Sequence, residues 1–295
     1  GFVRGNLMTR RLQYTIPHEY SSRRVLDFLK HLGFSHRLIT KLKQTPDGIL
    51  LNGEHIRTID PMNEGDVLEI NLPTDKKESI SIPVEMPLDI IYEDDDILVL
   101  NKPAMLAVHE SHNHLGDTLS NAVAFHLKKE GKPSVFRAVG RLDKGTSGLM
   151  VCALNRYAAS RLSGKIKKQY LAIATGVYEG EGTIDAPIYR PDPILTVRMV
   201  DGRGERAVTH WKALKNYGKN TLLRVRLETG RTHQIRVHFA SLGTPLVGDT
   251  MYGTPDGRIC HQALHCCECR FIHPVKNEKM HFFCDMPDDM KSIID

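Results

Sequence analysis

The chain has 295 residues, 41% of them hydrophobic and 25% charged, and its 40 lysines and arginines against 35 acidic residues give a formal net charge of +5. This size and composition suit an ordinary globular protein of two domains with a weak preference for an anionic partner. No stretch approaches the roughly 18 apolar residues of a membrane span, no secretory signal is visible, and the spacing of the six cysteines does not resemble a secreted disulfide scaffold, so we expect a cytoplasmic protein with free thiols and no membrane contact.

Residues 12–75 are expected to form a small α+β domain. The stretch SSRRVLDFLKHLGF has serine caps and apolar residues at helical spacing, and SHRLITKLKQ repeats the pattern. GILLNGEHI predicts a β-hairpin, because Asn52-Gly53 is the preferred pair for a type I′ turn, and MNEGDVLEINL adds a further strand. A helix pair carrying basic residues before a small hairpin sheet resembles the S4-type RNA-binding domain. The resemblance implies RNA contacts from Arg23, Arg24, Arg37, Lys41 and Lys43; the alternative is a small dimerisation or packing domain.

A larger domain is expected at residues 85–295, after a linker at 76–84 that overlaps the charged stretch PTDKKES at 73–79. Strand patterns dominate this region and helices between them are few, which favours an α+β fold with a mixed, mostly antiparallel sheet. Strands are expected at 97–100, 149–153, 170–174, 221–227 and 232–238, and helices at 120–129 and 156–165.

One carboxylate occupies an unusual place in GRLDKGTSGLMVCALN. Asp143 lies on a glycine-containing turn directly before an apolar strand. An ionised carboxylate near the core is costly unless it is paired or hydrogen-bonded, and the turn amides and the hydroxyls of Thr146 and Ser147 are candidate donors. The structural alternative is an Asx-turn that caps the loop.

A candidate partner for this carboxylate lies in LETGRTHQIRVH. The expected strand at 232–238 would hold Arg236 inside a sheet, where its planar guanidinium suits a carboxylate such as Asp143. Such a pair would keep the carboxylate ionised, as a nucleophile requires; the alternative is a purely structural ion pair.

An aromatic residue begins the next expected strand, in KKQYLAIATG. Tyr170 can be core filler with a satisfied hydroxyl, which is the commoner role, or a flat platform on which a base stacks.

Six motifs occur in the order seen in RluA-type pseudouridine synthases: NKPAMLAVH, GRLDKGTSGLMV, KKQYLAIATG, LETGRTHQIRVH, VGDTMYG and QALHCCECRFIHP. The resemblance implies a catalytic domain with a central active-site cleft. It also implies that Asp143 is the catalytic aspartate, with Tyr170 in the active site and Arg236 paired to the aspartate. It implies that Arg141 enters the RNA stack when the target base leaves it. Further candidates for substrate binding are Arg231, His233, Gln234, Lys102 and His109.

The implied activity is isomerisation of uridine to pseudouridine in RNA by base flipping, with Asp143 as nucleophile. Nothing is oxidised or added, so we expect no cofactor, and we expect a monomer whose partner is RNA. The S4-like region favours large-subunit ribosomal RNA, with transfer RNA as the alternative. A non-catalytic RNA-binding or ribosome-assembly factor and a hydrolase using Asp143 are the competing functions.

Two departures from the family pattern are visible. Gly140 stands where the family usually has histidine, and cysteines occupy QALHCCECRFIHP where small or apolar residues are usual. This segment is rich in metal-ligand types but holds a single CxxC, Cys266 to Cys269, and ligands along a strand would point to opposite faces. We therefore expect core thiols and no metal. The residues considered for that site are Cys260, His261, His265, Cys266, Cys267, Cys269 and His273.

Overall fold

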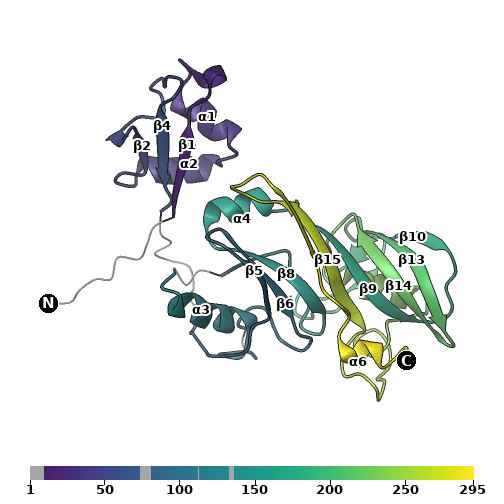
Figure 1. The fold of residues 1–295 in the computed structure, drawn as a ribbon. Helices are drawn as coiled ribbons and strands as arrows, with labels where there is room; N and C mark the ends of the chain where they lie inside the picture. The colour runs from purple at the N-terminus through teal and green to yellow at the C-terminus, as the bar shows by residue number, and fades with distance from the viewer. Residues whose placement is uncertain (1–9, 74–80, 112, 133–135) are drawn as a thin grey trace.

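The computed structural model describes residues 10–73, 81–111, 113–132 and 136–295, and most of the expected linker lies outside these ranges. Within them the strands form a four-stranded, a ten-stranded and a two-stranded sheet. Nearly all neighbouring strands run antiparallel, so the α+β fold with a mostly antiparallel sheet is confirmed (Figure 1).

The N-terminal unit, residues 10–73, has its own sheet and core. The second helix begins at its predicted serine cap, since the hydroxyl of Ser35 accepts the N–H of Leu38 at 3.2 Å. Gly33 takes φ +84° after the first helix, but the serine caps expected for that helix are wrong, because its N-cap is Arg24 with no side-chain hydrogen bond. Asn52 and Gly53 both have positive φ, as a type I′ turn requires. The first strand was not expected. The elements are β1 (Arg11–Thr15), a 3₁₀ turn (His18–Tyr20), α1 (Val25–His31), α2 (His36–Lys43), β2 (Ile49–Leu51), β3 (Glu54–His55) and β4 (Val67–Asn71), with strand order β1-β4-β2-β3.

The large sheet carries the rest of the chain (Figure 1). Its strands are β5 (Ile90–Glu93), β6 (Ile97–Lys102), β7 (Arg137–Val139), β8 (Ser147–Ala153), β9 (Lys167–Thr175), β10 (Glu181–Asp185), β13 (Val208–Tyr217), β14 (Asn220–Leu227), β15 (Leu264–Ile272) and β16 (Lys279–Phe283). The order is β10-β13-β14-β9-β15-β8-β6-β5, with β16 beside β15 and β7 beside β8. The remaining elements are α3 (Leu119–Lys129), α4 (Arg156–Leu162), β11 (Ile188–Tyr189), β12 (Met199–Val200), α5 (Gln234–Ser241) and α6 (Asp288–Lys291).

The central strand β8 is buried at every residue, as its apolar sequence indicates. It pairs in parallel with β15, and the two backbones approach closely at Gly148. A side chain there would meet the backbone of Cys266, at 2.3 Å from its carbonyl oxygen, so only glycine fits. The glycine of the TSG motif is thus explained by strand packing.

The prediction of a strand at 232–238 is wrong, because the residues from Gln234 onward belong to helix α5 and the preceding ones form a turn. The residues from Gln234 to Phe239 are all buried, so no polar face marked the helical period. His233 adopts left-handed backbone geometry before the helix, and the Gln234 side chain accepts the N–H of Arg231 at 3.0 Å. A short turn therefore leads into a helix that is surrounded by protein.

The N-terminal unit packs against α4 of the larger region through Tyr157. The Tyr157 hydroxyl donates to the carbonyl of Leu32 at 2.7 Å, and its ring stacks on Phe34 at 4.3 Å between centroids. Tyr157 belongs to the same buried cluster as the core of the small unit. Arg10 adds a two-point ion pair with Asp96. No helix in the described part of the chain has the length and apolar character to cross a membrane.

Candidate active site

The Asp143 loop connects β7 to β8 and is held from three sides. Leu142 is buried in the main core, and Gln262 donates to the hydroxyl of Thr146 at 3.1 Å. The ammonium of Lys102 donates to the carbonyl of Lys144 at 3.1 Å. These contacts fix the backbone on both sides of Asp143.

The carboxylate of Asp143 contacts Arg236, as expected. The Nη1 of Arg236 donates to Oδ2 of Asp143 at 3.2 Å. Asp249 holds the other edge of the guanidinium, accepting from Nε at 2.7 Å and from Nη2 at 2.9 Å. The side chain of Asp249 is 0% exposed and that of Asp143 is 27% exposed. A buried carboxylate therefore fixes the arginine, which presents its free edge to a carboxylate that solvent and ligands can reach.

The hydroxyls that we expected to bind Asp143 bind elsewhere. Thr146 accepts from Gln262, and the hydroxyl of Ser147 lies 2.8 Å from Nδ1 of His265 on β15. Among the described residues, only Arg236 hydrogen-bonds to the Asp143 carboxylate. That expectation was wrong because Ser147 already belongs to β8, whose side chains are surrounded by neighbouring strands.

His233 lies between Asp143 and Tyr252. Its Nε2 is 3.9 Å from Oδ2 of Asp143, and its Nδ1 is 2.7 Å from the hydroxyl of Tyr252. Burial lowers the pKa of His233, against the opposing effect of the Asp143 charge, so the ring is neutral near pH 7. The Tyr252 oxygen accepts the N–H of Arg198, so the Tyr252 hydroxyl can donate its own proton to Nδ1 of His233. With this assignment the ring proton of His233 is on Nε2, which faces Asp143.

Lys102 supports the loop instead of facing the cleft, which contradicts the expectation that it binds substrate. Its side chain is 1% exposed, and Nζ donates to the carbonyls of Pro103, Leu106 and Lys144 at 2.8 to 3.1 Å. Burial lowers the pKa of Lys102 to about 7, and the charge of Asp143 opposes this shift. Three carbonyl acceptors require the three N–H groups of the ammonium form, so we favour the charged state.

Tyr170 and Arg141 line a cleft of about 680 Å³ between β7, β9 and β14. Tyr170 is buried on β9, and burial followed by the charges of its neighbours, Asp143 among them, raises its pKa well above the usual value. Its phenol is therefore protonated at neutral pH. Arg141 is exposed, and no hydrogen bond or ion pair to it is found within the described residues. Gly140 takes φ +76°, which the usual family histidine would adopt only with strain.

The other expected substrate residues divide into structural and exposed groups. Gln234 is buried, with its amide donating to Val208 and its oxygen accepting from Thr229, so it shapes the turn and does not line the cleft. Arg231 is exposed and forms an ion pair with Glu205. His109 is exposed, and its ring lies edge-on to Phe136.

The five cations expected to bind RNA all lie on the N-terminal unit. Arg24 is held by a two-point ion pair with Asp27, and Arg23 lies over the ring of Tyr20. Arg37 and Lys43 are exposed, and Lys41 is half-buried.

The cysteines behave as core thiols where the structure buries them. Cys266 and Cys269 are fully shielded, and burial raises the pKa of Cys266 to about 11. A group of potential metal ligands lies elsewhere, at Asp94, Asp96 and His273, but cationic side chains already contact both carboxylates. These carboxylates are part of an ion-pair network.

Sequence reasoning missed Asp249 and Tyr252 as parts of the site. Both occur in VGDTMYG, which was recognised only as a motif. Asp249 follows the apolar pair Leu246 and Val247 and precedes a turn. This placement could have marked it as part of the site, because a carboxylate in apolar surroundings needs a buried cation.

Comparison with known proteins finds similarity to RNA pseudouridine synthases. Residues 96–241 match the family described as RNA pseudouridylate synthase. The chain is 39% identical to an uncharacterized RNA pseudouridine synthase, YjbO, of Bacillus subtilis, over 92% of this chain and 98% of that protein. It is 34% identical to ribosomal large subunit pseudouridine synthase D of Haemophilus influenzae, over 99% and 92% of the two chains. Human RNA pseudouridylate synthase domain containing 1 superposes with a TM-score of 0.56 at 27% identity, covering 75% and 89% of the two chains.

Proposed function

This chain belongs to the RNA pseudouridine synthase family, and we propose that it isomerises uridines of large-subunit ribosomal RNA in the cleft beside Asp143. As a pseudouridine synthase it is an isomerase. The observation that carries the assignment of the site is the partly exposed Asp143, with Arg236 fixed against it by Asp249. Its charge acts on Tyr170, and Tyr170 and the nearby Arg141 both line the cleft. A cleft of about 680 Å³ is in the range of small-molecule sites and suits an extruded nucleoside. The relatives named for the large ribosomal subunit support the choice of RNA.

In the isomerisation the N1–C1′ bond of uridine breaks, the uracil turns, and C5 bonds to C1′. C5 loses a proton and N1 gains one, so atoms and electrons balance without a co-reactant. We assign Asp143 to the sugar, as the carboxylate that attacks C1′ or removes the 2′ proton to start an elimination. Both routes need one ionised carboxylate beside C1′, as retaining glycosidases do.

Three groups would keep this carboxylate charged and oriented. Arg236 donates to it, and Lys102 contributes a buried positive charge behind the loop. Neutral His233 can offer its Nε2 proton from 3.9 Å. Partial burial of Asp143 limits access of water, which would otherwise hydrolyse a sugar adduct.

Tyr170 and Arg141 would handle the base and the gap that it leaves. A tyrosine that stays protonated is a poor base, so we assign Tyr170 to stacking on uracil and to hydrogen-bond donation, and not to removal of the C5 proton. Extruding the uridine costs a few kcal/mol, and the exposed Arg141, two residues before the carboxylate, would fill the vacated stack.

We further propose that residues 12–75 are an S4-like RNA-binding domain and residues 85–295 the catalytic domain of a monomer. The exposed Arg37 and Lys43 on α2 support this, since they remain available to phosphates. Arg24 is already paired with Asp27 and would contribute less.

Tritium release from RNA labelled at C5 of uridine tests the function. The full chain should release tritium from an unmodified large-subunit ribosomal RNA transcript, and mapped pseudouridines should appear at few positions. If tritium were released only from transfer RNA, transfer RNA would replace ribosomal RNA as the proposed substrate. Binding without release would indicate a non-catalytic factor, and free uracil would indicate a hydrolase.

A further inference from the structure

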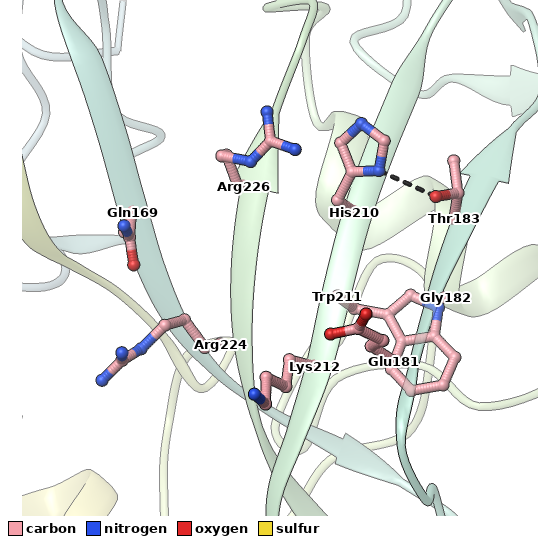
Figure 2. Close-up of a pocket in the computed structure, with 9 residues that line it drawn as sticks. All are labelled: Gln169, Glu181, Gly182, Thr183, His210, Trp211, Lys212, Arg224 and Arg226. Atoms are coloured by element: carbon pink, nitrogen blue, oxygen red, sulfur yellow. Dashed lines mark hydrogen bonds between the residues drawn. The ribbon is translucent and has the colours of Figure 1, made fainter.

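A basic groove lies on the face of the large sheet beside the cleft. Lys212 on β13 and Arg224 and Arg226 on β14 line it, together with Gln169 on β9 (Figure 2). Its volume is about 450 Å³. The strand register sets Lys212 opposite Arg224 and His210 opposite Arg226, and residues paired in this way share a face of the sheet.

The three cations of this groove, Lys212, Arg224 and Arg226, are exposed. Within the described residues, no hydrogen bond or ion pair to any of them is found. Glu181 is the single carboxylate that lines the groove. By contrast, carboxylates hold the following arginines: Arg10, Arg11, Arg24, Arg57, Arg203, Arg206, Arg231, Arg236, Arg258 and Arg270.

The groove continues the cleft that carries Tyr170. Gln169 and Arg226 line both cavities, and they are paired across β9 and β14, so they share a face of the sheet. Arg226 and Arg224 are two residues apart on β14, or about 7 Å, and Lys212 on β13 is one strand spacing, or about 5 Å, across from Arg224. Cations spaced along such a path suit successive charges of one polyanionic strand better than a single small anion.

We propose that this groove binds the sugar-phosphate backbone of the RNA strand that leaves the cleft on one side of the flipped uridine. Arg226 binds the phosphate nearest the cleft, Arg224 the next, and Lys212 the most distant. The planar guanidinium fits a phosphate with two hydrogen bonds, whereas the lysine acts as a point charge. This inference rests on the proposed function and adds to it a direction for the bound strand.

The test removes the three charges in the full-length protein. A Lys212→Gln, Arg224→Gln, Arg226→Gln variant is compared with a control of equal charge, Lys128→Gln, Lys129→Gln, Lys219→Gln, whose exposed lysines lie outside the groove. The probe is the unmodified large-subunit ribosomal RNA transcript with tritium at C5. Affinity is measured against salt concentration, and turnover is measured at saturating RNA.

Three lost phosphate contacts should lower the slope of log affinity against log salt by about 2, because each contact to a single strand contributes roughly 0.7. We expect affinity at low salt to fall about 10- to 100-fold while saturated turnover stays within about twofold. An unchanged slope, or an equal loss in the control, would overturn the phosphate-binding groove. If the unaltered protein bound this RNA but released no tritium, the proposed function would fail while the salt slopes still decided the groove.

Discussion

Arg236 and the pair Arg224 and Arg226 are arginines of the same domain in opposite electrostatic situations. Arg236 is 6% exposed and lies between Asp143 and Asp249. Arg224 and Arg226 are exposed on β14 and have no carboxylate partner among the described residues. A buried charge must be neutralised within the fold, whereas an exposed cation in water can remain unpaired until a polyanion binds.

This difference implies separate roles in catalysis and in RNA binding. The cluster of Asp143, Arg236 and Asp249 is already assembled without RNA, so altering it should lower turnover at saturating RNA. The unpaired cations act only when RNA arrives, so altering them should lower affinity and its dependence on salt. The following experiments test this division, in order of decreasing expected effect.

Removing the charge of Asp143 should have the largest effect. Asp143→Asn keeps the shape but loses the carboxylate that reacts at the sugar, so turnover should fall at least about 1000-fold with RNA affinity nearly unchanged. Tritium release and filter binding measure the two quantities. Asp256→Asn is the control and should keep normal turnover, because Asp256 is similarly exposed and also pairs with an arginine, Arg258, but outside the proposed site. Near-normal turnover of Asp143→Asn would disprove the assigned role.

Asp249→Asn should damage both stability and turnover. It leaves the buried Arg236 with one charged partner, and breaking a buried pair typically costs about 3–5 kcal/mol of unfolding free energy. If Asp249 positions Arg236, saturated turnover should also fall about 10- to 100-fold at temperatures where the variant is folded, with KM little changed. Urea unfolding and single-turnover assays measure these effects. A loss of stability with normal turnover would make Asp249 purely structural.

Exposed cations of the N-terminal unit should give a smaller effect on affinity alone. Arg37→Gln should weaken RNA binding about threefold to tenfold and leave turnover unchanged, because Arg37 is unpaired among the described residues. Arg57→Gln is the matched control, since Arg57 is held by Asp60 in the same unit. Equal affinities for the two variants would favour a packing module over an RNA-binding domain.

Lowering the pH should reduce the free energy of unfolding through the buried histidines of the larger region. Burial lowers the pKa of His238 and His265 in the folded state, so the unfolded chain binds more protons once the pH falls below about 6.5. The free energy of unfolding should therefore be fully retained above that pH and decline as the pH falls through the lowered folded-state values. Urea titrations at pH 7.5 and pH 5.5 check the sign, and greater stability at pH 5.5 would contradict it.

The sequence predicted those parts of the molecule in which one physical pattern dominates. The serine cap of α2, the Asn52-Gly53 turn and the apolar run of β8 from Leu149 to Ala153 could all be predicted, because each depends on adjacent residues. The Asp143–Arg236 contact was also expected, since a core carboxylate and a core guanidinium need each other.

The parts that were missed depend on surroundings that sequence does not display. Helix α5 is buried on all sides, so its polarity pattern carried no helical period. Lys102 was predicted to bind substrate, but its ammonium is surrounded by three backbone carbonyls, two from the turn that follows it and one from the Asp143 loop. Asp249 and the groove emerged only when the strands and turns were placed side by side.

The position of Tyr157 has a consequence for biosynthesis. The small N-terminal unit leaves the ribosome before the larger region, yet its core includes a side chain from α4, more than eighty residues beyond its last strand. Domains generally fold in the order of their synthesis. Here the first unit can gain its final stability only after α4 has emerged, so we expect the nascent N-terminal segment to remain protease-sensitive until that helix is translated.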